Sequence, residues 1–334
     1  MVRKDRIEYI DIAKGLGIIL VIIGHSHCPE EIRKFIYFFH MPFFFFISGF
    51  LISRARRFHE FLIDRIRYIL VPYYLLAFIS IVFSFFISRH YGNNLDVTNA
   101  ILNVFKMGFG MKADLETIYN GPLWFLPCLF YVQVFGYLIL KIENDLTKML
   151  IVIILSVSGI LLPAASPIGL GGALIALSFW FIGYQVKRQN LLQKISLSDR
   201  LMHIMAALCL LLIVGLMKSI GGNISMLDVT ISNYVWFLIG GTAGSIAILI
   251  SAMAIGKSRW VEFIGANAII IFGFHSLVQK SIDIPRIFTG IDFYGLFGRE
   301  VYFIIIIWNL LFCSIAVLLL SKTSFMKSLF LRRY

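Results

Sequence analysis

Residues 9–25 read YIDIAKGLGIILVIIGH, and this stretch decides the fold class. It is an apolar run interrupted by Asp11 and Lys14 and ending at His25. A helix that crosses the hydrocarbon core of a membrane needs about 20 mostly apolar residues, so the run predicts a membrane-spanning helix. Nine further apolar runs follow it, at about 35–53, 68–88, 122–140, 149–162, 169–186, 201–217, 234–256, 261–279 and 301–320.

The composition supports the same class along the whole chain. Of 334 residues, 59% are hydrophobic and only 14% are charged, and the mean hydropathy is +0.87. Soluble domains have about 25% charged residues, so soluble, disordered and fibrous classes are excluded. No ten-residue alternation typical of a membrane β-barrel is present. We therefore expect an all-α polytopic membrane bundle of about ten helices, as a single domain over residues 1–334 with no soluble domain.

The charge distribution predicts the topology. The chain has 30 Lys and Arg against 18 Asp and Glu, a formal charge of +12. Basic residues gather on alternate connections, which is typical of cytoplasmic segments of membrane proteins. An even number of spans with both termini in the cytoplasm fits this bias best. The excess charge therefore reflects topology, and we expect no nucleic-acid partner.

The first run carries a stripe of polar residues. Asp11 and Lys14 are three residues apart, so they can pair on one helix face. Lys14 and His25 are eleven apart, which returns to the same face about 16 Å along the axis. A charge in mid-membrane costs at least about 2.5 kcal/mol, so such residues call for an explanation. The alternative is an ion pair at the membrane interface and a histidine emerging from the membrane.

Two more histidines lie in apolar runs at similar depth. His40 precedes Pro42, which we expect to loosen the helix backbone around it, and His275 lies in the outer half of the ninth run with Asn267 eight residues before it. Each could be a structural histidine bonded to the backbone. Their convergence with His25 favours a proton-transfer site, because imidazole is the usual proton-transfer group near neutral pH. The sequence His25-Ser26-His27-Cys28 lacks the spacing of familiar zinc motifs, so we expect no metal.

Two interfacial features complete the candidate set. Arg65 and Arg67 precede the third run on the side expected to be cytoplasmic, where they are either topology anchors or phosphate ligands. Trp124 opens the fourth run on the opposite side, where tryptophan is common in any membrane protein.

These motifs together resemble the acyltransferase 3 family of integral-membrane O-acyltransferases, over the whole chain and most specifically in its first half. The resemblance is closest to stand-alone sugar O-acetyltransferases of bacterial surface polysaccharides. It rests on Asp11-x-x-Lys14-Gly15, the gap to His25, Phe39-His40-Met41-Pro42, Phe46-Ile47-Ser48-Gly49-Phe50, Arg65 and Arg67 before Pro72-Tyr73, Leu123-Trp124-Phe125-Leu126, and His275.

The resemblance implies transfer of an acetyl or other acyl group from acyl-CoA to a sugar hydroxyl of a surface polysaccharide or its lipid-linked precursor. The protein would lie in the bacterial inner (cytoplasmic) membrane, among membrane lipids, with acetyl-CoA as a donor substrate and no permanently bound cofactor. It implies a basic residue at Lys14, where many members carry Arg, and a basic pair at Arg65 and Arg67.

On this basis we assign expected roles. The catalytic set is His25 as general base, Lys14 at the donor or the developing negative charge, and Asp11 as partner of Lys14. Arg65 and Arg67 would hold CoA phosphates, and the acceptor would be contacted by His40, Trp124, Asn267 and His275. His40 and His275 would either orient the acceptor or share proton transfer. Direct transfer and a covalent acyl-histidine both remain open.

The main alternative is a polysaccharide exporter or flippase with the same membrane architecture. Transporters of this kind are built from internal repeats with paired broken helices, and the sequence gives no sign of either. The sugar, the acyl chain and the oligomeric state are not determined by the sequence.

Overall fold

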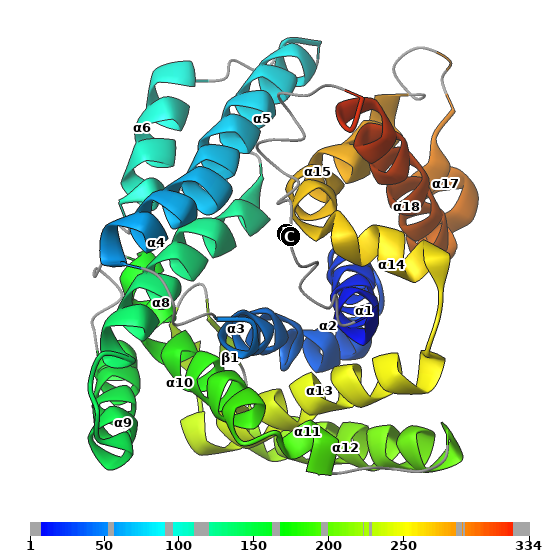
Figure 1. Ribbon diagram of the computed structural model, residues 1–334. Coiled ribbons are helices and arrows are strands. Elements are labelled where there is room, and N and C mark those ends of the chain that lie inside the picture. Colours follow the sequence, from blue (N-terminus) through cyan, green and yellow to red (C-terminus); the bar gives the residue numbers. More distant parts are fainter. Residues whose placement is uncertain are drawn as a thin grey trace.

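The computed structural model describes residues 8–52, 57–90, 96–109, 120–161, 168–194, 200–222, 224–226, 229–284, 289 and 291–322. Within these ranges the protein is a helix bundle with one small antiparallel strand pair (Figure 1). The long and short helices are α1 (Glu8–His25), α2 (Glu30–Tyr37), α3 (His40–Phe50), α4 (Phe58–Arg65), α5 (Val71–His90), α6 (Val97–Gly108), α8 (Phe125–Ile139), α9 (Asp145–Leu161), α10 (Ile168–Arg188), α11 (Leu191–Lys194), α12 (Arg200–Gly221), α13 (Tyr234–Ile255), α14 (Arg259–Ala266), α15 (Ala268–Lys280), α17 (Phe293–Phe297) and α18 (Val301–Leu320). The remaining elements are a π-helical turn η1 (Ile66–Leu70), the 3-10 turns η2 (Gly121–Trp124), η3 (Ser281–Asp283) and η4 (Gly298–Glu300), and the strands β1 (Ile224–Ser225) and β2 (Thr230–Ile231).

Six helical segments of the described chain are long and apolar enough to cross a membrane, and the bent pair α14–α15 makes a seventh if its halves count as one span. The six are Phe58–Phe86, Gly121–Ile139, Leu170–Arg188, Arg200–Gly221, Tyr234–Ile255 and Val301–Leu320. The other predicted runs are also helical, but α1 carries three charged residues, α3 has 11 residues and α9 has 17, against about 20 needed to span. The all-α membrane bundle is confirmed, whereas ten spans and cytoplasmic termini stay predictions.

The second apolar run is not one helix, which corrects the expectation of a continuous segment over 35–53. α2 ends at Tyr37, and α3 begins at His40. Pro42 lies in the first turn of α3, where its missing N–H is not needed, so the proline starts a helix rather than bending one around His40. The hydropathy pattern conceals this break because both sides of it are apolar.

The third run begins earlier than the sequence suggests. One helical segment runs from Phe58 to Phe86, so ten of the residues between the second predicted run, which ends at about 53, and the third, which begins at about 68, are helical. Phe61 explains the early start, because its buried ring stacks on Tyr137 of α8 with centroids 4.4 Å apart. The π-helical turn η1 lies inside this segment, directly after Arg65.

The ninth run, predicted as one span over 261–279, consists of the two helices α14 and α15, which meet at an angle of 85°. Asn267 is the residue at the bend. Its backbone N–H donates to carbonyls at the end of α14, and its carbonyl accepts hydrogen bonds from the N–H groups of Ile270 and Ile271 in the first turn of α15. Asn267 therefore ends one helix and begins the next.

Helices α1, α10 and α13 pack around α3 in the lower half of Figure 1, and all four helices contribute residues to the main buried cluster. A Cβ atom placed at Gly49 of α3 would strike the backbone of Trp180, and one at Gly183 of α10 would strike the backbone of Phe46. The two helices therefore touch through their backbones, as small residues allow in membrane bundles. By contrast, only 17% of the most apolar stretch of α12 and 22% of that of α18 are buried, so these two helices lie largely on the outside of the described bundle.

Candidate active site

The polar stripe of α1 begins with an ion pair. Lys14 Nζ lies 2.6 Å from Asp11 Oδ1, and the two side chains are 18% and 10% exposed, so the predicted contact is present. Helix α14 covers this part of α1 closely, because a Cβ atom at Gly265 would strike the Asp11 carbonyl and one at Gly15 would strike Val261. The pair is thus held between two helices rather than in open water.

At the other end of α1, the three histidines and one tyrosine form a row of contacting rings. The imidazole rings of His25 and His275 have centroids 5.3 Å apart. Tyr37 lies on another side of His25, with its hydroxyl 3.2 Å from Nδ1 of His25, and its ring is 4.9 Å from that of His40. The order of rings is therefore His40, Tyr37, His25, His275, and we call these four residues the histidine cluster. Convergence of the histidines, predicted from their similar depth, is confirmed.

Hydrogen bonds fix the rings of His40 and His275. Nδ1 of His40 lies 3.0 Å from the Ile36 carbonyl, and Nδ1 of His275 lies 2.6 Å from the Phe272 carbonyl. A carbonyl can only accept, so the proton of each neutral ring is on Nδ1 and the lone pair is on Nε2. Nε2 of His275 is buried and has no partner in the described part of the chain. Such an unsatisfied acceptor is costly in a protein interior unless a ligand or water completes it.

Two amides that the sequence analysis missed hold the site together. Gln279 of α15 donates to the carbonyl of His25 at 2.5 Å. His25 ends α1, so this carbonyl has no partner within its own helix. Asn120 is fully buried and donates to Ser80 Oγ at 3.0 Å and to the Gly273 carbonyl at 2.9 Å, which braces α5 against α15 two residues before His275. Neither amide stands out in the sequence, because each acts on a backbone carbonyl of a distant segment.

Asn267 and Trp124 lie away from the cluster. Asn267 donates from its side chain to the Phe263 carbonyl at 2.7 Å, at the bend about 12 Å along α15 from His275. Trp124 is half-buried and contacts Phe125, whose ring packs on Phe272, which contacts His275. A direct role of either residue in acceptor binding therefore stays a prediction.

Arg65 and Arg67 form a separate basic site on α4 and η1. The Arg65 guanidinium lies over the Phe61 ring, 4.7 Å from its centroid, and that of Arg67 lies over Tyr68 at 5.6 Å. Arg65 is half-buried and Arg67 is exposed. Their neighbours Arg54 and Arg56 fall outside the described residues. Arg65 precedes the π-helical turn η1 and Arg67 lies within it, and π-helical turns recur at functional sites. The role of the two arginines in binding CoA stays a prediction.

A metal site has no support in the ranges that the structure describes. No three His, Cys, Asp or Glu side chains there are placed to hold a metal ion. The histidine cluster has instead the features of an acid–base site, since it contains imidazoles with defined tautomers and one unsatisfied lone pair.

The family comparison agrees with this chemistry. A family model described as an acyltransferase domain, that of the acyltransferase 3 family, matches residues 7–326, which is nearly the whole chain. The protein belongs to the acyltransferase 3 family. No curated protein and no solved structure matches the chain. The resemblance drawn from the sequence motifs is confirmed, and this acyltransferase 3 protein is an integral-membrane acyltransferase.

Proposed function

We propose that this acyltransferase transfers an acetyl group from acetyl-CoA to a sugar hydroxyl of a bacterial surface polysaccharide or its lipid-linked precursor, at the inner membrane. The observation that carries the proposal is the pair of imidazoles from α1 and α15. His25 and His275 lie ring to ring, and Nε2 of His275 is a buried acceptor without a donor. We propose that Nε2 of His25 is a second acceptor, and two acceptors on neighbouring rings suit a substrate with adjacent hydroxyls, as sugars have.

In the proposed reaction His25 is the general base. It removes the proton of the attacking hydroxyl as the oxygen forms a bond to the thioester carbonyl carbon. The carbon–sulfur bond then breaks, and the CoA sulfur leaves and takes the proton from the His25 imidazolium. His275 accepts a hydrogen bond from a neighbouring hydroxyl of the same acceptor and so orients it.

Lys14 has a different task from His25, because they are about 16 Å apart along α1. A lysine side chain cannot cover that distance, so Lys14 does not stabilise the charge that develops at the thioester beside His25. Of the two roles expected for it, binding the donor is the one that this spacing supports. Asp11, 2.6 Å away, holds the ammonium in place.

The donor would lie along α1. We propose that Arg65 and Arg67 hold the CoA phosphates, because guanidinium groups suit phosphate geometry. The extended pantetheine arm has a length similar to the separation of Lys14 and His25. The nucleotide would then stay on the cytoplasmic side while the thioester reaches the histidine cluster.

The experiment that tests the proposal is direct detection of transfer. Purified protein in liposomes is given acetyl-CoA and a set of glycan acceptors, and mass spectrometry follows acetylated glycan while a thiol assay follows released CoA. We expect the two products in equal amounts. Movement of unmodified glycan across the membrane with neither product formed would instead support an exporter, and absence of acetylation with every acceptor and acyl-CoA would contradict the proposal.

A further inference from the structure

We infer that Tyr37 is a positioning residue for His25, and that its hydroxyl keeps the imidazole with the proton on Nδ1 and the lone pair on Nε2. The inference rests on the proposed function, because it explains how the proposed base is kept in its reactive form. In the sequence, Tyr37 is one of several aromatic residues in the apolar run over 35–53.

The first observation is the contact itself. The Tyr37 hydroxyl lies 3.2 Å from Nδ1 of His25, and their ring centroids are 5.6 Å apart. The other side of Tyr37 is occupied by His40, whose ring centroid is 4.9 Å away. His40 is in turn bonded to Ile36, the residue before Tyr37. Tyr37 is therefore enclosed between two imidazoles and has little freedom to move its hydroxyl away from His25.

The second observation concerns the tautomers. A tyrosine hydroxyl can donate or accept, so the contact admits two arrangements. If Tyr37 donated to Nδ1, the only N–H of a neutral His25 would be on Nε2, and that nitrogen could not remove a proton. If Nδ1–H donates to the Tyr37 oxygen, Nε2 is free as a base. The second arrangement is also the one that carbonyl acceptors impose on His40 and His275.

His25 differs from those two histidines in the source of its acceptor. His40 and His275 bond to carbonyls three or four residues earlier in their own chain segment. His25 instead bonds to a side chain twelve residues later, on α2. The tautomer of His25 therefore depends on a hydroxyl that can be removed by mutation, whereas the other two depend on the backbone.

The third observation is the residue before His25. A Cβ atom at Gly24 would come within 2.8 Å of the Tyr37 ring and 3.5 Å of Ile36. Any larger residue at 24 would thus push Tyr37 away from His25. The glycine makes room for Tyr37 beside the imidazole, which is a packing reason for the Gly24–His25 sequence.

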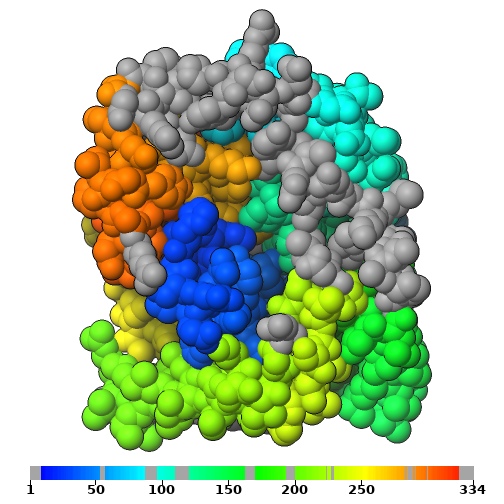
Figure 2. Space-filling model, turned by 180° about the vertical axis from the view of Figure 1, so that it is seen from behind, coloured from blue at the N-terminus to red at the C-terminus, as the bar shows by residue number. Residues whose placement is uncertain are grey.

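Helix α2 also makes an ion pair with a neighbouring helix at the surface. Glu31 pairs with Lys218 of α12, which connects α2 to a neighbouring helix. Figure 2, which views the molecule from the side opposite to Figure 1, shows the blue N-terminal part of the chain near the centre, bordered by later segments of the chain. Tyr37 thus ends a short helix that contacts α12 near its start and the two imidazoles at its end.

The activity test uses Tyr37→Phe, which keeps the ring and removes the hydroxyl. We expect kcat to fall about tenfold, the effect of one hydrogen bond that selects between two tautomers, and KM for acyl-CoA to stay within about twofold. The matched control is Tyr294→Phe, since Tyr294 also packs on a histidine, His27, but lies outside the cluster. We expect the control to stay within about twofold of wild type in both constants. Unchanged kcat in Tyr37→Phe would overturn the inference.

A spectroscopic test separates this inference from the proposed function. In protein with ¹⁵N-labelled histidine, the spectrum of wild-type His25 is expected to report a protonated Nδ1 and a lone pair on Nε2, and Tyr37→Phe is expected to give a mixture of both tautomers. A lone pair on Nδ1 in the wild type would contradict the positioning role even if acyl transfer is confirmed. The spectrum reads the hydrogen bond even if no transfer is found, so each idea can fail without the other.

Discussion

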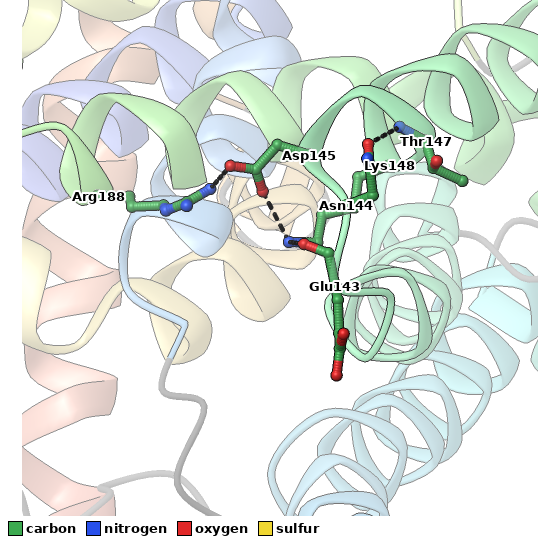
Figure 3. Close-up of polar contacts among 6 residues, drawn as sticks. All are labelled: Glu143, Asn144, Asp145, Thr147, Lys148 and Arg188. Atoms are coloured by element: carbon green, nitrogen blue, oxygen red, sulfur yellow. Dashed lines mark hydrogen bonds and ion pairs between the residues drawn. The ribbon is translucent and has the colours of Figure 1, made fainter.

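Two Asp–Lys pairs with the same three-residue spacing lie in very different surroundings. On α1, Asp11 and Lys14 are 2.6 Å apart and pressed against α14 by glycine contacts. On α9, Asp145 and Lys148 are 2.8 Å apart, and Figure 3 shows that Asp145 also pairs with Arg188 of α10. There Asp145 is 47% exposed, although the Lys148 side chain is 3% exposed.

The α9 pair belongs to a network that is complete without a substrate. Asp145 accepts from Lys148 through one oxygen and from Arg188 through the other, and Lys148 also donates to the Glu143 carbonyl at 3.2 Å. The hydrogen bonds from Lys148 and Arg188 lower the pKa of Asp145, which keeps it ionised. This network joins the start of α9 to the end of α10.

The comparison shows that the three-residue spacing of Asp and Lys on a helix predicts an ion pair but not the function of that pair. Both pairs satisfy the same helical rule. What separates them is the rest of their helix: α1 continues to His25 and the histidine cluster, whereas α9 ends without a comparable polar group in the part of it that the structure describes. A functional assignment for Asp11 and Lys14 therefore depends on the whole stripe, and the following variants test it.

The largest effect is expected where the α1 stripe reaches the histidine cluster. His25→Ala should lower the rate of acyl transfer by about 10²–10⁴-fold, the usual effect of removing a general base. His27→Asn is the control, because His27 is exposed with φ of +60° and asparagine tolerates that conformation. Turnover is measured on purified, folded protein. Near-normal turnover of His25→Ala would remove His25 from the mechanism.

The second effect compares the two lysines directly. Lys14→Met should lower kcat/KM for acyl-CoA by about 10–100-fold, as expected for the loss of a charge-assisted contact with the donor. Lys148→Met should leave kcat/KM within about twofold and lower the melting temperature instead. Steady-state kinetics and thermal unfolding of both variants decide the matter. Equal kinetic losses in the two would mean that the pairs do not differ in function.

The third effect compares Arg65 and Arg67 with Arg188 of the α9 network in the binding of acyl-CoA. Arg65→Ala and Arg67→Ala should each weaken binding of a non-hydrolysable acyl-CoA analogue by about tenfold, and lysine at either position should restore only part of it. Arg188→Ala serves as the control, since its guanidinium is already engaged by Asp145 at 2.6 Å. Titration calorimetry gives the affinities. If neither Arg65 nor Arg67 affects affinity, both are topology anchors.

The smallest effect is expected for stability. Arg188→Ala should lower the melting temperature by less than about 3 °C, because Arg188 and Asp145 are 40% and 47% exposed and exposed pairs contribute little. The lowered pKa of Asp145 determines how the stabilisation by this ion pair depends on pH. The contribution of ionised Asp145 to stability is fully present at pH values above the pKa of the unfolded state, about 3.9. It is lost as the pH falls through the lower pKa of the folded state. The difference between wild type and variant should thus disappear only in strong acid.

The sequence predicted the parts of the molecule that are costly in a membrane. His25, His40 and His275 were predicted to form one site because a polar imidazole inside an apolar run is costly in a membrane. The structure brings the three rings into one cluster. The pairing of Asp11 with Lys14 followed from helical spacing. Energetic cost and spacing are local properties, so one chain is enough to read them.

Tertiary features could not be read in the same way. The break between Tyr37 and His40 and the bend at Asn267 lie inside continuous apolar runs, where hydropathy does not change. Tyr37 and Gln279 act on His25 from distant positions, and tyrosine or glutamine near a membrane boundary has no distinctive pattern. Their importance depends on which helices meet, which the sequence does not state.

The central claim, that α1 connects a donor on one side of the membrane to an acceptor at the histidine cluster, can be tested in sided proteoliposomes. Acyl-CoA is sealed on the side of the protein that carries Arg65 and Arg67, and the glycan acceptor is added only on the other side. Our account predicts acylated glycan outside and free CoA inside, both abolished by His25→Ala. Transfer that occurs only when both substrates are on the same side would contradict it.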